Sequence, residues 1–323
     1  MQELRKAIYD LPLIFAFHET IENLDGKALP TARLIFSPPH LHLRHIGILC
    51  GSFNPLTLAH TKLAEHARDT FALDSVFFSL AKVTINKEQV TGLSLADRLL
   101  LLTLYAQQHK QLGVTLANRG LYFEQAQAFR SLFGEQVQLS FLIGMDKLLQ
   151  IFDPRYYQDR TAALQQLFRS ASLIVANRGD MDEQSFTQLF EQPENQPFRS
   201  HVQFFTLPAE VTALSATAIR NALSAGNTIH SQVPNETAIF LTETRAFHPP
   251  LQYDDEQINT YEVRQQLLSK LYAVRSWAEQ QVDFHQLLSL ALSASDRGRT
   301  LRHTTQKEDF ATLVQACPRQ PST

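Results

Sequence analysis

The chain of 323 residues is 44% hydrophobic and 19% charged, which excludes a disordered protein and leaves room for about two folded domains. Its formal net charge of −3 gives no general attraction to nucleic acid or to anionic lipid. The two cysteines, Cys50 and Cys317, make neither a disulfide framework nor a zinc signature. The N-terminus lacks the apolar core of a signal peptide, and no apolar run reaches the ~20 residues that span a bilayer. We therefore expect a cytoplasmic protein that binds neither nucleic acid nor membrane.

A series of short apolar stretches predicts strands that are buried on both faces, because each is nearly unbroken in hydrophobicity and rich in Val, Ile and Phe. They cover residues 46–50, 75–80, 137–144, 172–176 and 202–207. Apolar residues at helical spacing predict helices between them, over 57–71, 94–107 and 121–133. Strand–helix alternation of this kind indicates an α/β fold, a doubly wound parallel sheet, over residues 44–248. Ligands of such a domain bind outside the carboxyl ends of the strands.

The segments that flank this domain have a different character. Residues 1–43 contain no interpretable motif and are treated as an N-terminal extension of unknown role. Residues 249–323 form a C-terminal helical module, because 256–294 contain no Pro or Gly and carry apolar residues at helical intervals. We expect these helices to pack against the α/β domain or to form a homo-oligomer, since so many apolar side chains do not stay exposed. An autonomous bundle on a linker is the alternative, and the polar tail after Arg297 is expected to fray.

The first candidate site is the stretch GSFNPLTLAH at residues 51–60, which follows a predicted strand and opens a predicted helix. Gly51 allows a sharp turn, Pro55 stops the strand, and Thr57 can cap the helix. The unpaired N–H groups and the positive dipole end of a helix start attract anions. His60 falls close enough to the helix start to face such an anion. A plain loop with a solvent-exposed histidine is the alternative.

The second candidate site is the stretch LSATAIR at residues 214–220, after the last predicted strand. Ser215 is a candidate N-cap, and the hydroxyl groups and amides around it form a second anion nest. Arg220 lies within about a turn of this helix start. Taken alone, the stretch is equally consistent with an ordinary capped helix.

Together the two stretches resemble the signatures of the nucleotidylyltransferase superfamily, Gly-x-Phe-x-Pro-x-[His/Thr]-x-Gly-His and Ile-Ser-[Ser/Thr]-x-x-x-Arg. Within it the chain is most similar to nicotinamide or nicotinate mononucleotide adenylyltransferases. Supporting stretches occur in the family's order, namely SLAKVTINK at 79–87, ADR at 96–98, FLIGMD at 141–146, IVANR at 174–178 and VPN at 233–235. The chain departs from the family at Ala59, where Gly is usual, and at Ala216, where a second hydroxyl is common. The usual Pro-Pro-His is replaced by Val-Thr-Ile-Asn, and the aromatic residues that hold the pyridine ring have no clear counterpart.

The resemblance implies a Rossmann-like fold and transfer of the AMP part of ATP to a mononucleotide, with release of pyrophosphate. It implies catalytic roles for His60, Lys87 and Arg220. The residues that it assigns to ATP are Gly51, Ser52, Phe53, Thr57, His60, Arg178, Ser215, Thr217 and Arg220. Those that it assigns to the acceptor are Asn54, Lys87, Arg98, Gly144, Asp146, Phe152 and Tyr156. Mg²⁺ is expected to be held by the substrate phosphates and water, without a metal site built by the protein.

The chemistry of this reaction fits a chain that shows no obvious Ser–His or Asp–His pair. A phosphate monoester is largely dianionic at neutral pH, because its second pKa is about 6, and it attacks without a general base. Alignment of the two anions is worth roughly 7–11 kcal/mol, and neutralisation of the triphosphate adds to it.

Two alternative functions stay open. The acceptor could be another phosphorylated molecule, such as pantetheine phosphate, or the chain could be a non-catalytic nucleotide-binding regulatory protein.

Overall fold

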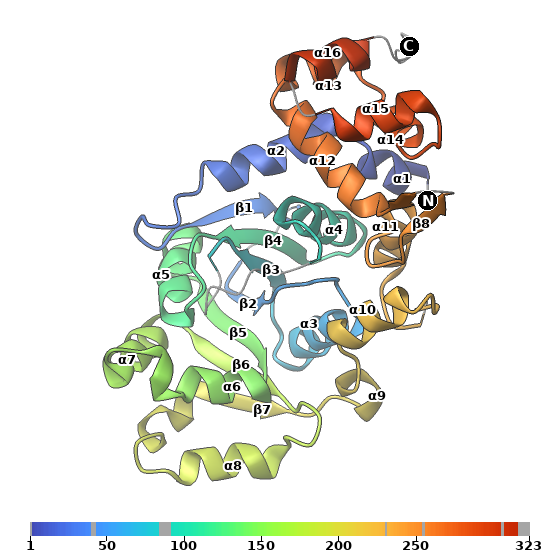
Figure 1. Ribbon diagram of the computed structural model, residues 1–323. Helices are drawn as coiled ribbons and strands as arrows, with labels where there is room; N and C mark the ends of the chain where they lie inside the picture. Colours follow the sequence, from blue (N-terminus) through green and yellow to red (C-terminus); the bar gives the residue numbers. More distant parts are fainter. Residues whose placement is uncertain are drawn as a thin grey trace.

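A seven-stranded sheet forms the centre of the computed structural model, which describes residues 2–39, 43–83, 92–229, 231–253, 256–304 and 307–315 (Figure 1). The strand order is β1-β4-β3-β2-β5-β6-β7, and every neighbouring pair is parallel except β1 and β4. The strands are β1 Ala32–Phe36, β2 His45–Cys50, β3 Ser75–Ala81, β4 Leu112–Ala117, β5 Gln138–Gly144, β6 Ser172–Ala176 and β7 Val202–Phe205. The predicted doubly wound α/β fold is confirmed.

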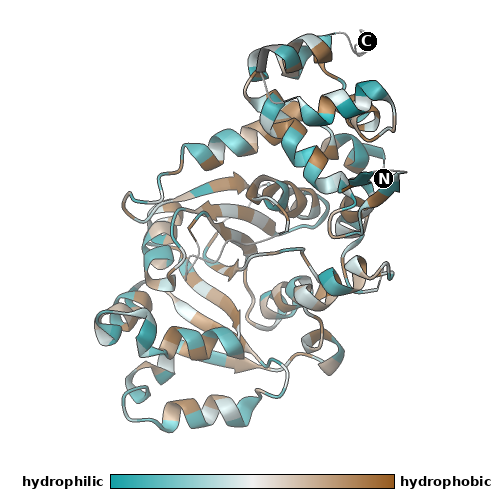
Figure 2. Cartoon of the chain, viewed as in Figure 1, coloured by the Kyte–Doolittle hydropathy of each residue, from teal (hydrophilic) through white to brown (hydrophobic). Residues whose placement is uncertain are grey.

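The sheet is buried on both faces, as the unbroken apolar stretches predict. In register across β2, β3 and β5, Leu49 lies beside Leu142, and one residue earlier Ile48 lies between Phe77 and Phe141. Successive side chains of a strand point to opposite faces, so the two sets enter separate apolar clusters. Each fully buried side chain of this size contributes about 1.5–3 kcal/mol. Figure 2 shows the result, with hydrophobic strands between helices whose outer faces are hydrophilic.

Helices cover both faces of the sheet. The face of Ile48 packs against α5 Tyr122–Phe133, α6 Met145–Phe152, α7 Arg160–Ser170 and α8 Glu183–Glu191. The face of Leu49 packs against α3 Leu58–Thr70, α4 Leu95–Gln108, α10 Ala216–Ser224 and α11 Asn235–Thr244. The short elements η2 Pro154–Tyr156, η3 Gln196–His201 and α9 Ala209–Thr212 connect them. The predicted helices over 57–71, 94–107 and 121–133 correspond to α3, α4 and α5.

Two strands of the sheet, β1 and β4, are not predicted by the apolar patterns of the sequence. Gly113 interrupts the apolar pattern of β4, yet every residue of this strand is buried. A Cβ at Gly113 would lie 2.3 Å from the ring of Phe77 on β3, so packing between the strands requires glycine there. β1 pairs antiparallel with β4 and brings part of the N-terminal extension into the central sheet. The remainder of that extension forms α1 Gln2–Ile8 and α2 Leu11–Glu22.

The C-terminal helices pack against the rest of the chain, as one of the two predicted arrangements requires. After the hairpin β8 Leu251–Tyr253 and β9 Glu256–Ile258, they are α12 Thr260–Tyr272, α13 Arg275–Gln281, α14 Phe284–Ala291, α15 Asp296–His303 and α16 Lys307–Gln315. They gather beside α1, α2 and α11 (Figure 1). Their buried side chains join the apolar cluster that also contains Phe15 of α2 and Leu100 of α4. The division of the chain at residues 43/44 and 248/249 stays a prediction.

The expectation of a fraying tail after Arg297 is wrong, at least as far as residue 315. Few apolar residues are needed to hold α15 and α16, because Leu301, Phe310 and Val314 are all buried. Arg302 adds an ion pair with Glu256 at 2.6 Å, and Ser295 caps α15 by accepting the Gly298 N–H. None of the helices in the described parts of the chain combines the length and the apolar character that crossing a membrane needs.

Candidate active site

A cavity of about 510 Å³ opens at the carboxyl ends of β2 and β5. The chain runs from β2 through β3 to β4 on one side and from β5 through β6 to β7 on the other, so the strand order reverses between β2 and β5. This switch point is where a doubly wound sheet binds its ligands. Both candidate stretches contribute to the lining, which includes Gly51, Ser52, Asn54, Thr57, His60, Gly144, Asp146, Arg178, Ser215, Thr217 and Arg220.

The loop after β2 is held by bonds at several of its residues. The Gly51 N–H donates to Ser79 O at 3.2 Å, and a Cβ at Gly51 would press on the ring of Phe53 at 3.1 Å. Phe53 itself is fully buried and has a positive φ of 43°, a conformation that non-glycine residues rarely adopt. The Asn54 carbonyl accepts from Arg220 at 2.8 Å. Because these contacts fix its backbone, the loop presents a defined surface to a ligand.

His60 stands in the first turn of α3 and is tied to the residue that caps this helix. Its Nδ1 accepts the Thr57 N–H at 3.1 Å and lies 2.8 Å from Thr57 Oγ1. A nitrogen that accepts a backbone N–H carries no proton, so the proton of the neutral ring is on Nε2. Burial and the nearby guanidinium of Arg178 lower the pKa of His60 to about 4. The side chain is therefore a neutral hydrogen-bond donor at physiological pH.

The second stretch forms the start of α10, opposite the loop. Ser215 caps this helix by accepting the Ala218 N–H at 3.1 Å, and the hydroxyl hydrogen of Ser215 stays available to a ligand. Arg220 connects the two stretches, because it donates to Asn54 O and, at 3.1 Å, to Thr217 Oγ1. A guanidinium has five N–H donors, so further ones can bind phosphate oxygens.

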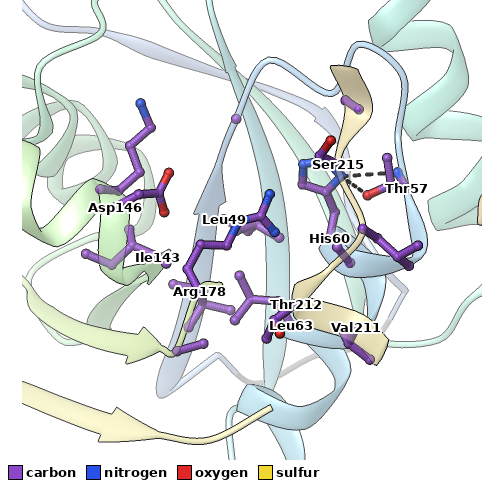
Figure 3. Close-up of a pocket in the computed structure, with 18 of the residues that line it drawn as sticks. Leu49, Thr57, His60, Leu63, Ile143, Asp146, Arg178, Val211, Thr212 and Ser215 are labelled. Carbon is purple, nitrogen blue, oxygen red and sulfur yellow. Dashed lines mark hydrogen bonds between the residues drawn. The ribbon is translucent and has the colours of Figure 1, made fainter. Parts of the chain in front are cut away.

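The opposite wall comes from the ends of β5 and β6. Gly144 is the residue before α6, and a Cβ there would lie 2.6 Å from Asp146 Oδ1, so glycine leaves room for this carboxylate. Figure 3 shows Asp146 on one side of the cavity and His60 with Ser215 on the other. Arg178 extends from the end of β6 toward the space between them (Figure 3).

Some lining residues were not singled out from the sequence. Ala59, Ala176, Leu207 and Val211 form a small apolar cluster at one edge of the cavity. The methyl group of Ala59, which replaces the family's usual glycine, is thus part of an apolar wall. Tyr122 also lines the cavity, at the start of α5. The signal that would have found it is strand β4, because the loop after a parallel strand reaches the ligand edge of the sheet.

The structure does not bring all the predicted site residues into this cavity. Phe53 packs its ring against His60, with 5.1 Å between the centroids, and Arg98 lies behind the loop, where it donates to Ser52 O at 3.1 Å. Phe152 is buried in an aromatic cluster with Phe168, Phe190 and Phe198. Tyr156 bonds through its hydroxyl to Gln150 on the adjoining helix and is not among the lining residues. Lys87 lies outside the described residues.

The chemistry of the cavity suits a polyanion. Three helices, α3, α6 and α10, begin at residues that line its wall, and the positive dipole end of each helix favours an anion there. Arg178, Arg220 and Lys147 add positive charge, and Asp146 is the one carboxylate among the lining residues that the structure describes. No group of three or more His, Cys, Asp or Glu side chains in the described ranges is arranged to hold a metal ion.

Several known proteins are similar to this chain. Residues 48–222 match the family model described as cytidylyltransferase-like. A probable nicotinate-nucleotide adenylyltransferase of Synechococcus sp. (strain JA-3-3Ab) is 30% identical over 219 residues, 66% of this chain and 100% of that protein. Its counterpart in strain JA-2-3B'a(2-13) is 29% identical over 214 residues, 64% of this chain and 98% of that protein. Nicotinic acid mononucleotide adenylyltransferase of Plasmodium falciparum, complexed with NaAD, aligns at 15% identity and a TM-score of 0.48, covering 63% of this chain and 97% of that one.

Proposed function

The chain belongs to the cytidylyltransferase-like family and is an ATP-dependent nucleotidyltransferase, and we propose that it joins nicotinate mononucleotide to the AMP part of ATP. The products are the dinucleotide, deamido-NAD, and pyrophosphate. The observation that carries the proposal is the cavity at the switch point, where Arg220 links the loop after β2 to the start of α10. The similarity to probable nicotinate-nucleotide adenylyltransferases along nearly their whole length supports the choice of acceptor.

The triphosphate of ATP fits between the two helix starts. We assign its β- and γ-phosphates to Arg220, Ser215 and Thr217, whose donors converge at the start of α10. Nε2–H of His60 donates to an oxygen of the phosphate that is transferred, where negative charge grows in the transition state. A neutral donor suits this position, because it binds the oxygen without having to lose or gain a proton. The apolar wall of Leu207 and Val211 provides a surface for the adenine ring, with Arg178 on the adenosine side.

The acceptor lies toward β5, with Asp146 and Gly144 at its side, and we also assign to it Asn54 of the loop, which lines the cavity. Its 5′-phosphate attacks the α-phosphorus of ATP, the bond to the bridging oxygen breaks, and pyrophosphate leaves. The attacking oxygen carries no proton at neutral pH, so the step needs no general base. We keep Lys87 and Arg98 among the groups assigned to the acceptor, with Arg98 acting through the Ser52 carbonyl that it holds.

Mg²⁺ would neutralise the triphosphate as it does in related phosphoryl chemistry. The donor set fits an ion that enters with ATP, since Asp146 is the single carboxylate of the described cavity wall and the other donors are cationic or neutral. Phosphate oxygens and water would therefore hold it. We also propose that the protein works in the cytoplasm, which the free thiol of Cys50 favours, and that the C-terminal helices support a homo-oligomer.

Release of pyrophosphate from ATP, measured with a panel of acceptors, tests the proposal. We expect turnover with nicotinate mononucleotide and weaker turnover with nicotinamide mononucleotide. Turnover with pantetheine phosphate alone would assign the chain to another branch of the superfamily. Binding of ATP without turnover on any acceptor would identify a regulatory nucleotide-binding protein.

A further inference from the structure

The carboxylate of Asp97, at the start of α4, is buried where three distant segments of the chain meet, and it is only 1% exposed. Arg264 of α12 is fully buried and donates to both carboxylate oxygens at 2.8 Å. The other terminal nitrogen of Arg264 donates to Ile8 O, at the end of α1. Tyr261 and Gln265, also on α12, each donate to Asp97 Oδ2 at 2.6 Å. α12 therefore fixes this carboxylate with three of its side chains.

The same helix also fixes the backbone at the start of α4. The hydroxyl oxygen of Tyr261 accepts the Ser94 N–H at 2.8 Å, while its hydrogen goes to Asp97. Ser94 is the N-cap of α4 and in turn donates its hydroxyl to Asp97 at 3.0 Å. Burying an ion pair between two helices costs desolvation free energy, and apolar residues of the same volume are often at least as stabilising. What the pair supplies is a single, directional arrangement of α12 and α4.

The start of α4 is in turn bonded to the active-site loop, residues 51–57. Arg98 donates to Ser52 O at 3.1 Å, and the Leu93 N–H donates to Asn54 Oδ1 at 3.0 Å. Both donors lie within a few residues of the positions that α12 holds. Nε of Arg98 is buried without a hydrogen-bond partner among the described residues, and the bond to Ser52 holds the other end of this guanidinium.

We propose that α12 is a positioning element of the active site, in which Arg264 and Tyr261 hold the start of α4 and thereby the shape of loop 51–57. Neither side chain lines the cavity, so both are positioning residues that act through Arg98 and Leu93. α12 lies beyond residue 222, where the match to the family model ends. The proposal rests on the proposed adenylyl transfer, for which this loop positions the phosphates.

Matched conservative substitutions separate positioning from general stabilisation. Arg264→Lys keeps the charge but loses the guanidinium, whose Nη1 bonds Asp97 while its Nη2 bonds Ile8 O, and Tyr261→Phe removes one hydroxyl. The control is Arg302→Lys, since Arg302 is buried and forms an ion pair with the partly exposed Glu256 inside the C-terminal module, and its hydrogen bonds and ion pairs in the described part of the chain do not reach α4. All variants are assayed in the full-length chain, well below the lowest melting temperature. The readouts are kcat, KM for each substrate, and ATP affinity by calorimetry without acceptor.

We expect Arg264→Lys and Tyr261→Phe to lower kcat by about ten- to a hundredfold, since small misplacements of reacting groups have costs of this order. ATP affinity should weaken as well, while KM for the acceptor changes less than kcat. Arg302→Lys should lower the melting temperature with kcat and ATP affinity unchanged.

The proposal is overturned if the two α12 variants melt earlier but retain the parent's kcat and ATP affinity. It is equally overturned if Arg302→Lys lowers kcat as much as Arg264→Lys does, because a general loosening of the module would then explain both. Should the parent fail to transfer adenylyl groups to nicotinate mononucleotide, the proposed function fails. The ATP affinities of the same variants would still judge the positioning proposal.

Discussion

Replacing His60 with alanine removes two interactions whose effects the structure allows to be separated. Nε2–H is the donor available to the transferred phosphate, and a donor aimed at charge that grows in the transition state is worth ~2.7–4 kcal/mol. The expected loss of kcat is therefore about 100- to 1000-fold. Nδ1 accepts the Thr57 N–H at 3.1 Å, and losing a bond of this kind lowers the free energy of unfolding by about 1 kcal/mol.

His60→Asn is the control that separates the two effects. The amide oxygen of asparagine can accept the Thr57 N–H in place of Nδ1, but the shorter side chain does not reach the position of Nε2. The asparagine variant should melt closer to the parent than the alanine variant does, whereas both should lose turnover to a similar extent. Pyrophosphate release at saturating ATP and acceptor measures kcat, and thermal melting measures stability. If the asparagine variant kept kcat within about tenfold of the parent, the transition-state role of His60 would be refuted.

The remaining predictions concern pH and the two walls of the cavity. Between pH 6.5 and 4, unfolded His60 takes up a proton that folded His60 refuses, because the folded pKa is about 4. The parent should thus lose unfolding free energy relative to His60→Ala as pH falls through this window, and a constant difference in denaturant melts would contradict the assigned environment. Arg220→Ala should weaken ATP binding in calorimetry more than acceptor binding, because Arg220 clamps phosphate oxygens; the reverse order would exchange the two subsites. Gly144→Ala should displace the Asp146 carboxylate, since a Cβ would lie 2.6 Å from Oδ1; its KM for the acceptor should rise with ATP affinity unchanged, and an unchanged KM would remove Asp146 from the acceptor site.

The sequence predicts the parts of the fold that depend on local apolar patterns. The strands after which the chain turns into the cavity, β2, β5 and β6, are all among the predicted ones. The apolar pattern does not predict β4, because Gly113 interrupts it. The glycine is required by the ring of Phe77, a neighbour that only the assembled sheet brings close. The polar composition of the tail predicts that it frays, but a few buried side chains and the ion pair of Arg302 hold it as far as the structure describes it. Patterns along the chain do not show contacts of this kind.

In the candidate site, too, local features could be predicted from the sequence and tertiary contacts could not. The helix starts at Thr57 and Ser215 could be predicted, because capping residues and anion-binding N–H groups are local features. The neutral state of His60 could not, since it depends on burial and on Arg178, more than a hundred residues later in the chain. The location of Phe152 in an aromatic cluster outside the cavity is likewise set by tertiary packing. The link from Arg264 to Asp97 spans 167 residues and has no signature in the sequence.

The most direct test of the proposed reaction follows the phosphorus atoms of ATP. ATP labelled at the α-phosphorus, and in a parallel sample at the γ-phosphorus, is incubated with the chain, Mg²⁺ and nicotinate mononucleotide, and the products are separated by chromatography. Attack on the α-phosphorus predicts that the α label appears in the dinucleotide and the γ label in pyrophosphate, in equal amounts. A γ label that appears on the acceptor, or an α label that stays in ATP while the nucleotide binds, would contradict the proposed reaction.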